Sequence, residues 1–483
     1  MAAKAPPVTR QQVRAAYEHG PEAVYELIVG LLTPLVERIE RLEAERAKDS
    51  HNSGKPPSSD PVRVPKSLRS KSGKRPGGQP GHPGATLEMR SAPDAVIVHA
   101  ATHCAACGRV LAESHDEMVD GVVERRQVFE LPPTKLSCTE HRLERRRCRA
   151  CGTWTAGAFP SEVGTTVQYG PGVLALGVYL TTQQLLPAAR AAEVIGAITG
   201  QHVSPATITT AEQRAVVELE PVSARVRGGL RRSPVLNLDE TGFFISGRRQ
   251  WLHTVSTPTL THYTAHEKRG RLAHEATGIL PDYRGTIVHD SYDSYFTYPC
   301  RHALCGVHLL RELTFLLEER GERWAAALKR SLMTMKRCVE RSRAAGQTSL
   351  DHATLRRYER RYDALLSAGE AAQPPPRPRI DGTGRPRRTL AANMLLRLRD
   401  YSEAVLRFLH DFAVPFDNSE AERDLRMMKV EQKISGGFRT SAGAETFCVI
   451  RGYLATARKQ GYSALDALHD VFTAQPFFPA VPE

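Results

Sequence analysis

The chain has 483 residues, 41% of them hydrophobic, so it is long enough for several domains and can bury at least one core. Its 66 lysines and arginines exceed its 53 acidic residues, and the formal charge of +13 favours a polyanionic partner such as nucleic acid. No apolar run is long enough to span a membrane, and the first residues lack the apolar segment of a signal peptide. We therefore expect a cytoplasmic protein with no membrane partner.

The first domain, residues 1–50, is expected to be helical. Residues 22–48 carry apolar side chains at heptad spacing, which predicts a helix, although Pro34 argues against a perfectly regular one. The two heptad positions are Tyr25, Leu32 and Ile39, and Ile28, Leu35 and Leu42. The pattern favours a short coiled coil that pairs two subunits. Packing of an amphipathic helix on its own chain is an equally good interpretation, because so few heptads are available.

Residues 51–95 are interpreted as a linker arm. The segment 51–86 is rich in proline, glycine and serine, which prevents a packed core, and it is strongly basic, with Lys74 and Arg75 among its cations. Such an arm can lie along DNA phosphates, and a solvated linker is the alternative.

Two Cys-x-x-Cys pairs mark residues 96–160 as a zinc-binding domain. Cys104 with Cys107 and Cys148 with Cys151 each end in glycine, as a tight turn around a metal needs. Four thiolates make a closed tetrahedral site, so the Zn²⁺ is expected to be structural, within a zinc ribbon. Cys138 and His141 lie between the pairs, and either is an alternative ligand.

Residues 161–230 are expected to form a helical module that binds DNA. The stretch 171–220 is helical in pattern with a break near Gly200, and Ser204 followed by Pro205 is a typical helix start. Helix, break and helix fit a helix-turn-helix-like module, and a plain helical bundle fits equally well.

Acidic residues follow apolar strands further along the chain. Short strands are predicted at VLNLD (235–239), WLHTVST (251–257), THYTAH (261–266) and TIVHD (286–290). Asp239 and Asp290 are each expected at a strand end, where two carboxylates can share a magnesium ion. Residues 305–370 predict long charged helices, and helices resume after a Pro/Arg-rich loop at 373–388.

A third carboxylate is available within residues 417–424, which open a helix. Glu422 shares a helical face with the cations Arg426 and Lys429, whereas Glu420 and Asp424 lie on other faces. Acids placed there only to favour the helix dipole are an equally good interpretation.

Several ordered blocks of sequence resemble transposases of the insertion sequence 66 family. They include NSGKPPSSD (52–60), KRPGGQPGHPG (74–84), LDETG (238–242), HDSYDSY (289–295), CGVHLLREL (305–313), and PFDNSEAERDLRMMK through SGGFRT (415–440). Where that family usually has Asp-Gly-Tyr, this chain has Asp290-Ser291-Tyr292, with a further acid at Asp293.

The resemblance implies a multidomain α+β protein with an RNase H-like catalytic core. The core would comprise residues 231–300 and 405–470, with a helical insertion at 301–404 and a tail at 471–483. A DDE triad of Asp239, Asp290 and Glu422 would bind catalytic Mg²⁺ or Mn²⁺. Proposed helpers are His308, Arg311, Arg423 and Lys433.

The expected function is that of a bacterial DDE transposase that binds element ends and target DNA at the nucleoid, then cuts and joins strands. A homo-oligomer and small companion proteins of the same element are the expected partners. The alternatives are a catalytically silent DNA-binding regulator derived from a transposase, a zinc-ribbon scaffold or RNA-binding protein, and a metal-dependent nuclease without strand transfer.

Overall fold

The computed structural model describes residues 8–47, 87–99, 101–111, 125–130, 134–160, 162–375 and 388–482. The basic segment at 51–86, with Lys74 and Arg75, lies outside the described residues. The chain divides into two compact units. The larger comprises Met1–Lys66, Thr139–Ala197 and Gln201–Glu483, and the smaller comprises Ser67–Cys138 with Ile198–Gly200.

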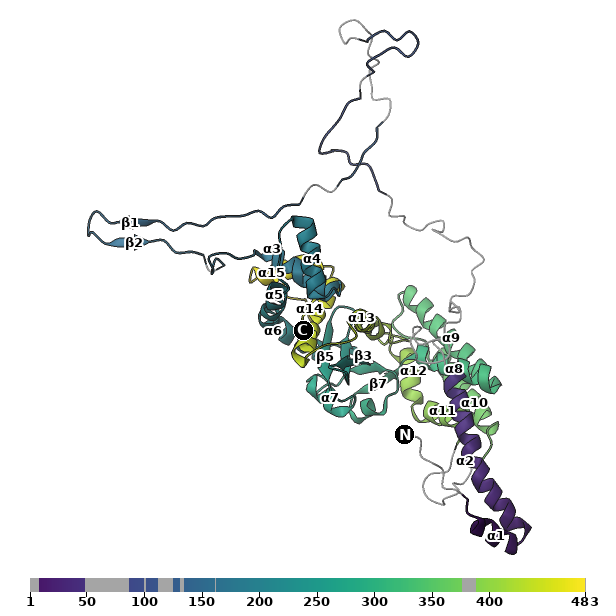
Figure 1. The fold of residues 1–483 in the computed structure, drawn as a ribbon. Helices are drawn as coiled ribbons and strands as arrows, with labels where there is room; N and C mark the ends of the chain where they lie inside the picture. The colour runs from purple at the N-terminus through teal and green to yellow at the C-terminus, as the bar shows by residue number, and fades with distance from the viewer. Residues whose placement is uncertain are drawn as a thin grey trace. The chain divides into compact units, whose positions relative to one another are not determined.

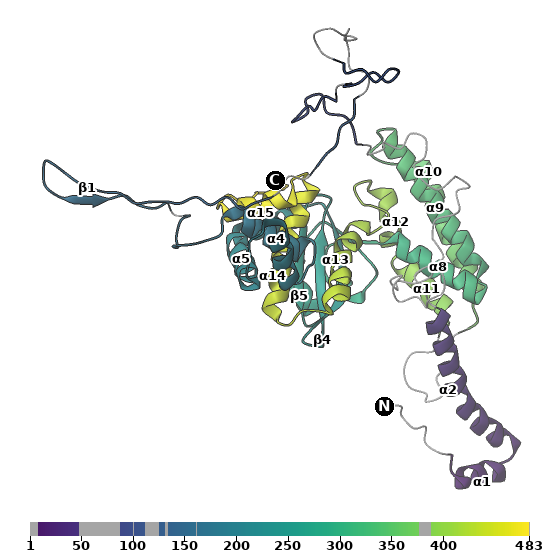
Figure 2. The same cartoon turned by 45° about the horizontal axis from the view of Figure 1, so that its top comes forward.

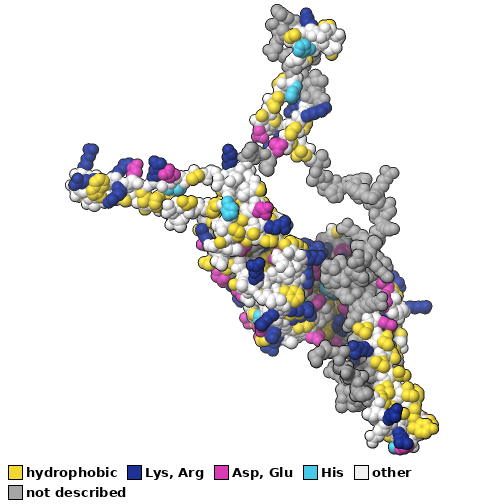
Figure 3. Space-filling view, in the orientation of Figure 1, with side chains coloured by type: hydrophobic (Ala, Val, Ile, Leu, Met, Phe, Trp, Pro, Cys, Tyr) yellow, Lys and Arg dark blue, Asp and Glu magenta, His cyan; other side chains and the backbone are white. Residues whose placement is uncertain are grey.

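Two helices open the larger unit, α1 (Arg10–Glu18) and α2 (Pro21–Ala47). Thr9 and Gln12 form a capping box that begins α1. The expected helix is present as α2, and it continues through Pro34. Its heptad residues Tyr25, Ile28, Leu32, Leu35, Ile39 and Leu42 are all exposed, and Figure 3 shows hydrophobic side chains along this segment at its lower right. Pairing of this stripe with a second subunit stays a prediction.

The two Cys-x-x-Cys turns each lie in a small hairpin. In the smaller unit a bridge between His103 and Val110 closes the first turn. In the larger unit strand β1 (Arg145–Arg147) pairs with β2 (Trp154–Ala156) on either side of the second turn. Elsewhere in the described parts of 96–160 the backbone is irregular, although the sequence favours β structure.

A mixed five-stranded sheet forms the centre of the larger unit (Figure 1). Its strands are β3 (Val235–Ile245), β4 (Arg248–Ser256), β5 (Thr261–His266), β6 (Thr286–His289) and β7 (Arg301–Leu304). They lie in the order β5-β4-β3-β6-β7. The hairpin strands β3, β4 and β5 are antiparallel, whereas β6 and β7 run parallel to β3.

The sequence interpretation was wrong about two strands. Asp239 does not end its strand, because β3 continues to Ile245 by pairing with β4 along its whole second half. The true turn lies at Ser246 and Gly247, which both have positive φ values. The segment Arg301–Leu304 was assigned to the helical insertion and instead forms β7. Only Ala303 and Leu304 of this segment are apolar, so it shows neither an apolar run nor an alternating pattern.

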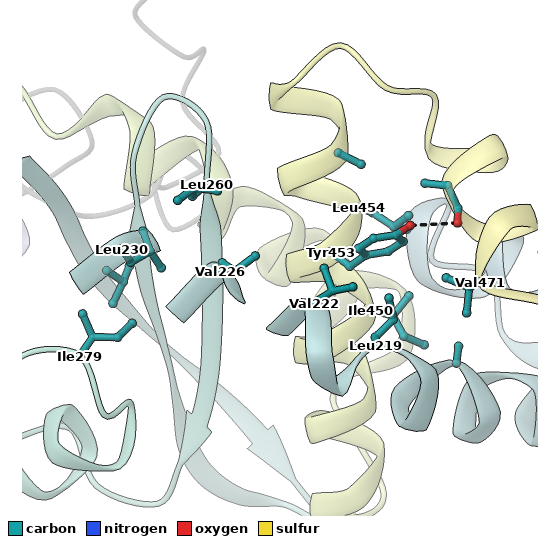
Figure 4. Close-up of a cluster of buried hydrophobic side chains, with 14 of the residues drawn as sticks. Leu219, Val222, Val226, Leu230, Leu260, Ile279, Ile450, Tyr453, Leu454 and Val471 are labelled. Atoms are coloured by element: carbon teal, nitrogen blue, oxygen red, sulfur yellow. Dashed lines mark hydrogen bonds between the residues drawn. The ribbon is translucent and has the colours of Figure 1, made fainter. Parts of the chain in front are cut away.

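Helices and the sheet share one hydrophobic core. The helices before the sheet are α3 (Pro171–Val178), α4 (Ala188–Thr199), α5 (Pro205–Glu218) and α6 (Glu220–Arg232), and α7 (Arg271–Ala276) follows β5. A π-helical turn, Tyr179–Gln183, extends α3. The break at Gly200 and the Ser204 cap occur as expected. Buried residues of α3, α5 and α6 join those of β3 and β4 in this core, part of which is drawn in Figure 4. A helix-turn-helix-like role for these helices stays a prediction.

Between β7 and α13 the structure describes five helices, which build a second core together with Leu304 of β7 and Phe416. They are α8 (Gly306–Arg320), α9 (Arg323–Ala344), α10 (His352–Ala371), α11 (Leu390–Asp400) and α12 (Ser402–His410). Leu328, Met335, Tyr362 and Leu398 are almost completely buried among them. Helix α12 also packs on β7, which joins this helical group to the edge of the sheet.

The last helices return to the sheet (Figure 2). Helix α13 (Ser419–Ser435) packs on β3 and β4, and α14 (Ser441–Lys459) packs on β5. Helix α15 (Ala464–Phe472) packs on α3. The chain therefore places residues from beyond the insertion directly over the strand that carries Asp239.

A buried hydroxyl tests how this core is stabilised. Tyr453 on α14 is 4% exposed, and its Oη donates to the Ala467 carbonyl (3.0 Å; Figure 4) and accepts from the Phe477 amide (3.0 Å). Tyr453→Phe leaves both groups unpaired, so we expect a loss of about 1–2 kcal/mol in the free energy of unfolding, measured by urea denaturation. Tyr462→Phe removes a surface hydrogen bond to Asp470 and is the control, with an expected change below about 0.5 kcal/mol. Equal stability of Tyr453→Phe and the wild type would contradict this account.

Candidate active site

The register of the sheet brings Asp239 and Asp290 level with each other. Asn237 pairs with Val288 in the parallel β3–β6 ladder. Asp239 lies two residues beyond Asn237, within β3. Asp290 lies two residues beyond Val288, directly after β6. Residues two apart on a strand face the same side. Asp239 and Asp290 therefore lie on the same face of the sheet, one on β3 and the other at the end of the neighbouring strand β6.

Asn418 fixes the start of α13 against the same strand. Its side chain is fully buried; Nδ2 donates to the Leu238 carbonyl (2.6 Å) and Oδ1 accepts from Asn237 Nδ2 (2.9 Å). The Asn418 carbonyl then accepts the Glu422 amide (3.1 Å) in the first turn of the helix. Because Asn418 is bound to β3 and Glu422 follows it by one helical turn, the carboxylate of Glu422 is held beside Asp239.

The three carboxylates share one electrostatic field. Burial raises the pKa of Asp239 well above its ordinary value, and the negative charges of Glu240, Asp290 and Glu422 raise it further. Asp290 and Glu422 keep 29% and 24% of their side chains exposed, so the cluster opens to solvent. Like charges gathered at a solvent-accessible point fit a divalent cation, and carboxylate oxygens are the ligands that magnesium prefers.

The structure also separates the acids of the 417–424 segment. Asp424 accepts hydrogen bonds from Ser256 and Thr261, and its Oδ2 lies 2.8 Å from Lys459 Nζ. Glu420 pairs with the same lysine at 3.5 Å. Both acids therefore attach α13 to the sheet and to α14, whereas Glu422 is the one that adds to the field at Asp239.

The predicted helper residues divide into two groups. His308 Nδ1 lies 3.6 Å from Glu422 Oε1, and Lys429 is attracted by Asp239 while its Nζ lies 3.5 Å from the Gly242 carbonyl. Arg423 pairs with Glu420 at the surface (3.2 Å).

The other predicted helpers lie on α13 and α8 and form the second group. Arg426 and Lys433 are exposed on α13, and Arg311 is half-buried on α8. Within the described residues, no ion pair joins these three to the carboxylates.

Two residues beside the carboxylates escaped the sequence analysis. Glu240 has a fully buried side chain, and Arg269 Nε donates to its Oε1 at 2.7 Å. Arg269 Nη2 also lies 3.8 Å from Asp290 Oδ2, and its guanidinium stacks over Tyr292. Glu240 follows Asp239 directly, but only the β3–β4 pairing shows that it occupies a buried strand position.

The two Cys-x-x-Cys turns have the same internal geometry, each described by itself. In the first, Gly108 (φ +70°) donates to the Cys104 carbonyl, and Cys104 donates to the Arg109 carbonyl. In the second, Gly152 (φ +77°) and Cys148 make the corresponding bonds. Backbone amides of its own turn lower the pKa of the Cys104 thiol, and the Thr153 hydroxyl lowers that of Cys151. Both effects favour the thiolate that a metal binds. The four-cysteine zinc site stays a prediction.

A comparison with protein families relates this chain to the transposases. The model described as "Transposase IS66 family" matches residues 166–446, more than half of the chain. The chain belongs to the IS66 family of transposases. A second model, a family of unknown function (DUF6444), matches residues 8–88. No curated protein matches the chain. Among the described helices, none combines the length and the apolar character needed to cross a bilayer.

The raised pKa of Asp239 predicts a pH-dependent effect on stability. In the unfolded chain this carboxyl ionises near its ordinary pKa of about 3.9, whereas in the folded chain it ionises at a higher pH. Its ionisation therefore destabilises the metal-free fold at neutral pH, and this cost vanishes below the unfolded pKa. With EDTA present, we expect Asp239→Asn to melt at a higher temperature than the wild type at pH 7 and to lose that advantage near pH 3.

The exposed Asp293→Asn is the control for this measurement, because removing its charge should leave the melting temperature unchanged. A metal-free Asp239→Asn protein that melts at or below the wild-type temperature at pH 7 would show that the carboxylates do not repel one another as described.

Ser291 is strained where the family usually has glycine. Its φ of +77° lies in the left-handed region, which costs a residue with a Cβ atom about 1–2 kcal/mol. We expect Ser291→Gly to stabilise the fold by roughly 1 kcal/mol in urea denaturation, because glycine relieves this strain at some entropic cost. Ser291→Ala keeps the Cβ and should give no such gain. Equal effects of the two substitutions would refute the strain.

Proposed function

We propose that this chain is a metal-dependent DDE transposase that cleaves DNA at the ends of its element and joins those ends to target DNA. One observation supports the proposal most directly: three carboxylates from separate parts of the chain come together. Asp239 lies on β3, Asp290 at the end of β6 and Glu422 on α13, and the charges of Asp290 and Glu422 raise the pKa of Asp239. The sheet order, with an acid on the central strand and another on the parallel neighbour, supports an RNase H-like core.

The donor set fits the divalent ions that the family implies. The negative charges of Asp290 and Glu422 raise the pKa of Asp239, and a bound cation would compensate this charge, so the three carboxylates would hold Mg²⁺ or Mn²⁺. When bound, the ions would supply an activated water and stabilise the charge that develops on the leaving oxygen.

The side chains of the protein set the geometry of the reaction. In the first step water oxygen attacks a phosphodiester, the phosphorus–O3′ bond breaks, and the 3′ oxygen takes up a proton. In the second step the oxygen of that 3′-hydroxyl attacks a target phosphodiester and loses its proton. A phosphorus–O3′ bond to the element end forms, the phosphorus–O3′ bond of the target breaks, and the 3′ oxygen of the target leaves and takes up a proton. Asn418 holds Glu422 beside Asp239, Arg269 orients Asp290, and His308 is placed to accept a proton beside Glu422.

A basic and aromatic surface borders the carboxylates and suits a DNA backbone. Trp251 on β4 contacts the guanidinium groups of both Arg249 and Arg269. Lys429 and the exposed Arg426 lie on α13 beside the same end of β3. DNA is the partner that a transposase family implies, and phosphate contacts from such cations position a duplex without reading its sequence.

The remaining proposals concern assembly. We propose that Cys104, Cys107, Cys148 and Cys151 supply ligands to a structural Zn²⁺, that the exposed stripe of α2 pairs two copies of the chain, and that small companion proteins of the element assist at its ends. Chromosomal DNA in the bacterial cytoplasm would be the site of action.

Joining of a pre-cut element end tests the function. A short duplex with its 3′-OH exposed is incubated with the full-length protein, magnesium and a supercoiled plasmid. We expect joined products from the wild type and a reduction of about 100-fold or more with Asp290→Ala, because even outer partners of metal ligands are worth 10- to 100-fold. Asp293→Ala removes an exposed acid three residues away and should join normally.

Each result that would contradict the transposase proposal points to a different alternative. Tight, end-specific binding without joining in magnesium or manganese, with companion proteins added, would favour a DNA-binding regulator. Cleavage of an intact end without joining would favour a nuclease. Equal joining by Asp290→Ala and the wild type would remove Asp290 from the site.

A further inference from the structure

A second group of ligand-type side chains lies behind β3, on the face opposite Asp239. Glu240 follows Asp239 in the strand, so its side chain points to the other side of the sheet. It pairs directly across with His253 of β4, and His274 of α7 completes the group. One potential ligand atom from each of the three lies within 4.8 Å of the others. With backbone and side chain counted together, Glu240, His253 and His274 are 9%, 3% and 2% exposed, respectively.

Two ring nitrogens in this group have no hydrogen-bond partner. His253 Nδ1 and His274 Nε2 are both buried and unpaired. His253 Nε2 lies 3.2 Å from the Lys268 carbonyl, which can only accept, so the proton is on Nε2 and Nδ1 carries a bare lone pair. His274 Nδ1 lies 3.4 Å from the Ser294 hydroxyl, which can accept a hydrogen bond from a protonated Nδ1, and in this tautomer Nε2 carries a bare lone pair.

Burial keeps both imidazoles neutral, as metal ligands must be. It lowers the pKa of His253 to about 4 and that of His274 to about 3. A buried nitrogen without a hydrogen-bond partner destabilises a fold, and one ligand bound between two such nitrogens and a carboxylate would satisfy all three groups.

We propose that Glu240, His253 and His274 bind one transition-metal dication, with zinc as the natural candidate. Two imidazoles and one carboxylate are a standard three-ligand set for zinc, with water in the fourth position. Ligand bonds of about 2.0–2.1 Å place ligand atoms roughly 3.3 Å apart, so rotation of the side chains draws the group together on binding.

Surrounding groups already orient these ligands. Tyr295 Oη donates to Glu240 Oε2 at 2.5 Å, and Arg269 Nε donates to Oε1. His274 stacks on the Tyr295 ring with centroids 4.5 Å apart, which fixes the imidazole plane. Outer partners of this kind hold metal ligands in position. The ion would join β3, β4 and α7 behind the strand that carries Asp239. Its three ligands are buried, so a water in the fourth position has no access to substrate and the role of the ion is structural.

The test must exclude the other ligand groups of the chain. The full-length protein is freed of metal, its accessible cysteines are alkylated, and Co²⁺ is titrated in excess Mg²⁺, which occupies oxygen-only sites. We expect one Co²⁺ per chain, with nitrogen and oxygen but no sulfur neighbours in X-ray absorption. The absence of sulfur excludes Cys305, which lies with His308 and Glu422 in another candidate group.

Variants then assign the site. His274→Gln should weaken Co²⁺ binding by about 100-fold or more, and Glu240→Gln should weaken it as well. His262→Gln changes a half-buried histidine on β5 outside the group and should bind normally. Circular dichroism and thermal melting without metal show whether each variant is folded.

Three outcomes would overturn the proposal. They are no Co²⁺ retained by the wild type in excess Mg²⁺, sulfur in its coordination shell, or unchanged affinity in a folded His274→Gln protein. The first would leave a bridging water as the occupant. If the variants do not fold, the stoichiometry and ligand types of the wild type still decide, since no other described group of three offers two imidazoles and a carboxylate.

Discussion

The buried amide of Asn418 is the contact on which the candidate site depends. Its hydrogen bonds to Leu238 and Asn237 join segments 180 and 181 residues apart, and the carboxylate of Glu422 follows one turn later. A buried amide that loses these partners is costly, so the start of α13 has one favourable position on β3. This explains how the helices α8 to α12, which pack in a second hydrophobic core, can stand between β7 and α13 while Glu422 still acts on Asp239.

Strand β3 has a different role on each face. Asp239 lies with Asp290 and Glu422 on a side open to solvent, and Glu240 lies with His253 and His274 on a buried side. Alternation along a strand is enough to separate two neighbouring acids in this way. Arg269 spans the two groups, since it contacts both Glu240 and Asp290. It compensates part of the negative charge that the strand concentrates.

The carboxylates make the metal-free site a source of instability. Burial and three neighbouring negative charges oppose the ionisation of Asp239, and Ser291 next to Asp290 holds a left-handed conformation that favours glycine. Strain and repulsion at one place are typical of functional sites, whose geometry the rest of the fold must hold. Here the sheet register and the acids that attach α13, Asp424 and Glu420, provide that support.

The sequence by itself determined the local features of this protein. Strands β4 and β5, the cap at Ser204, the glycine turns of both cysteine pairs and the two aspartates after apolar segments all follow from residues close together in the chain. It could not determine where β3 ends or that Arg301–Leu304 is a strand, because hairpin pairing and sheet position are decided by partners elsewhere. Spacing left Glu420, Glu422 and Asp424 open, and the family resemblance pointed to Glu422. Only the tertiary structure shows that Glu420 and Asp424 pair with Lys459. Lys459 lies 35 residues beyond Asp424, and such long-range pairing leaves no local pattern in the sequence.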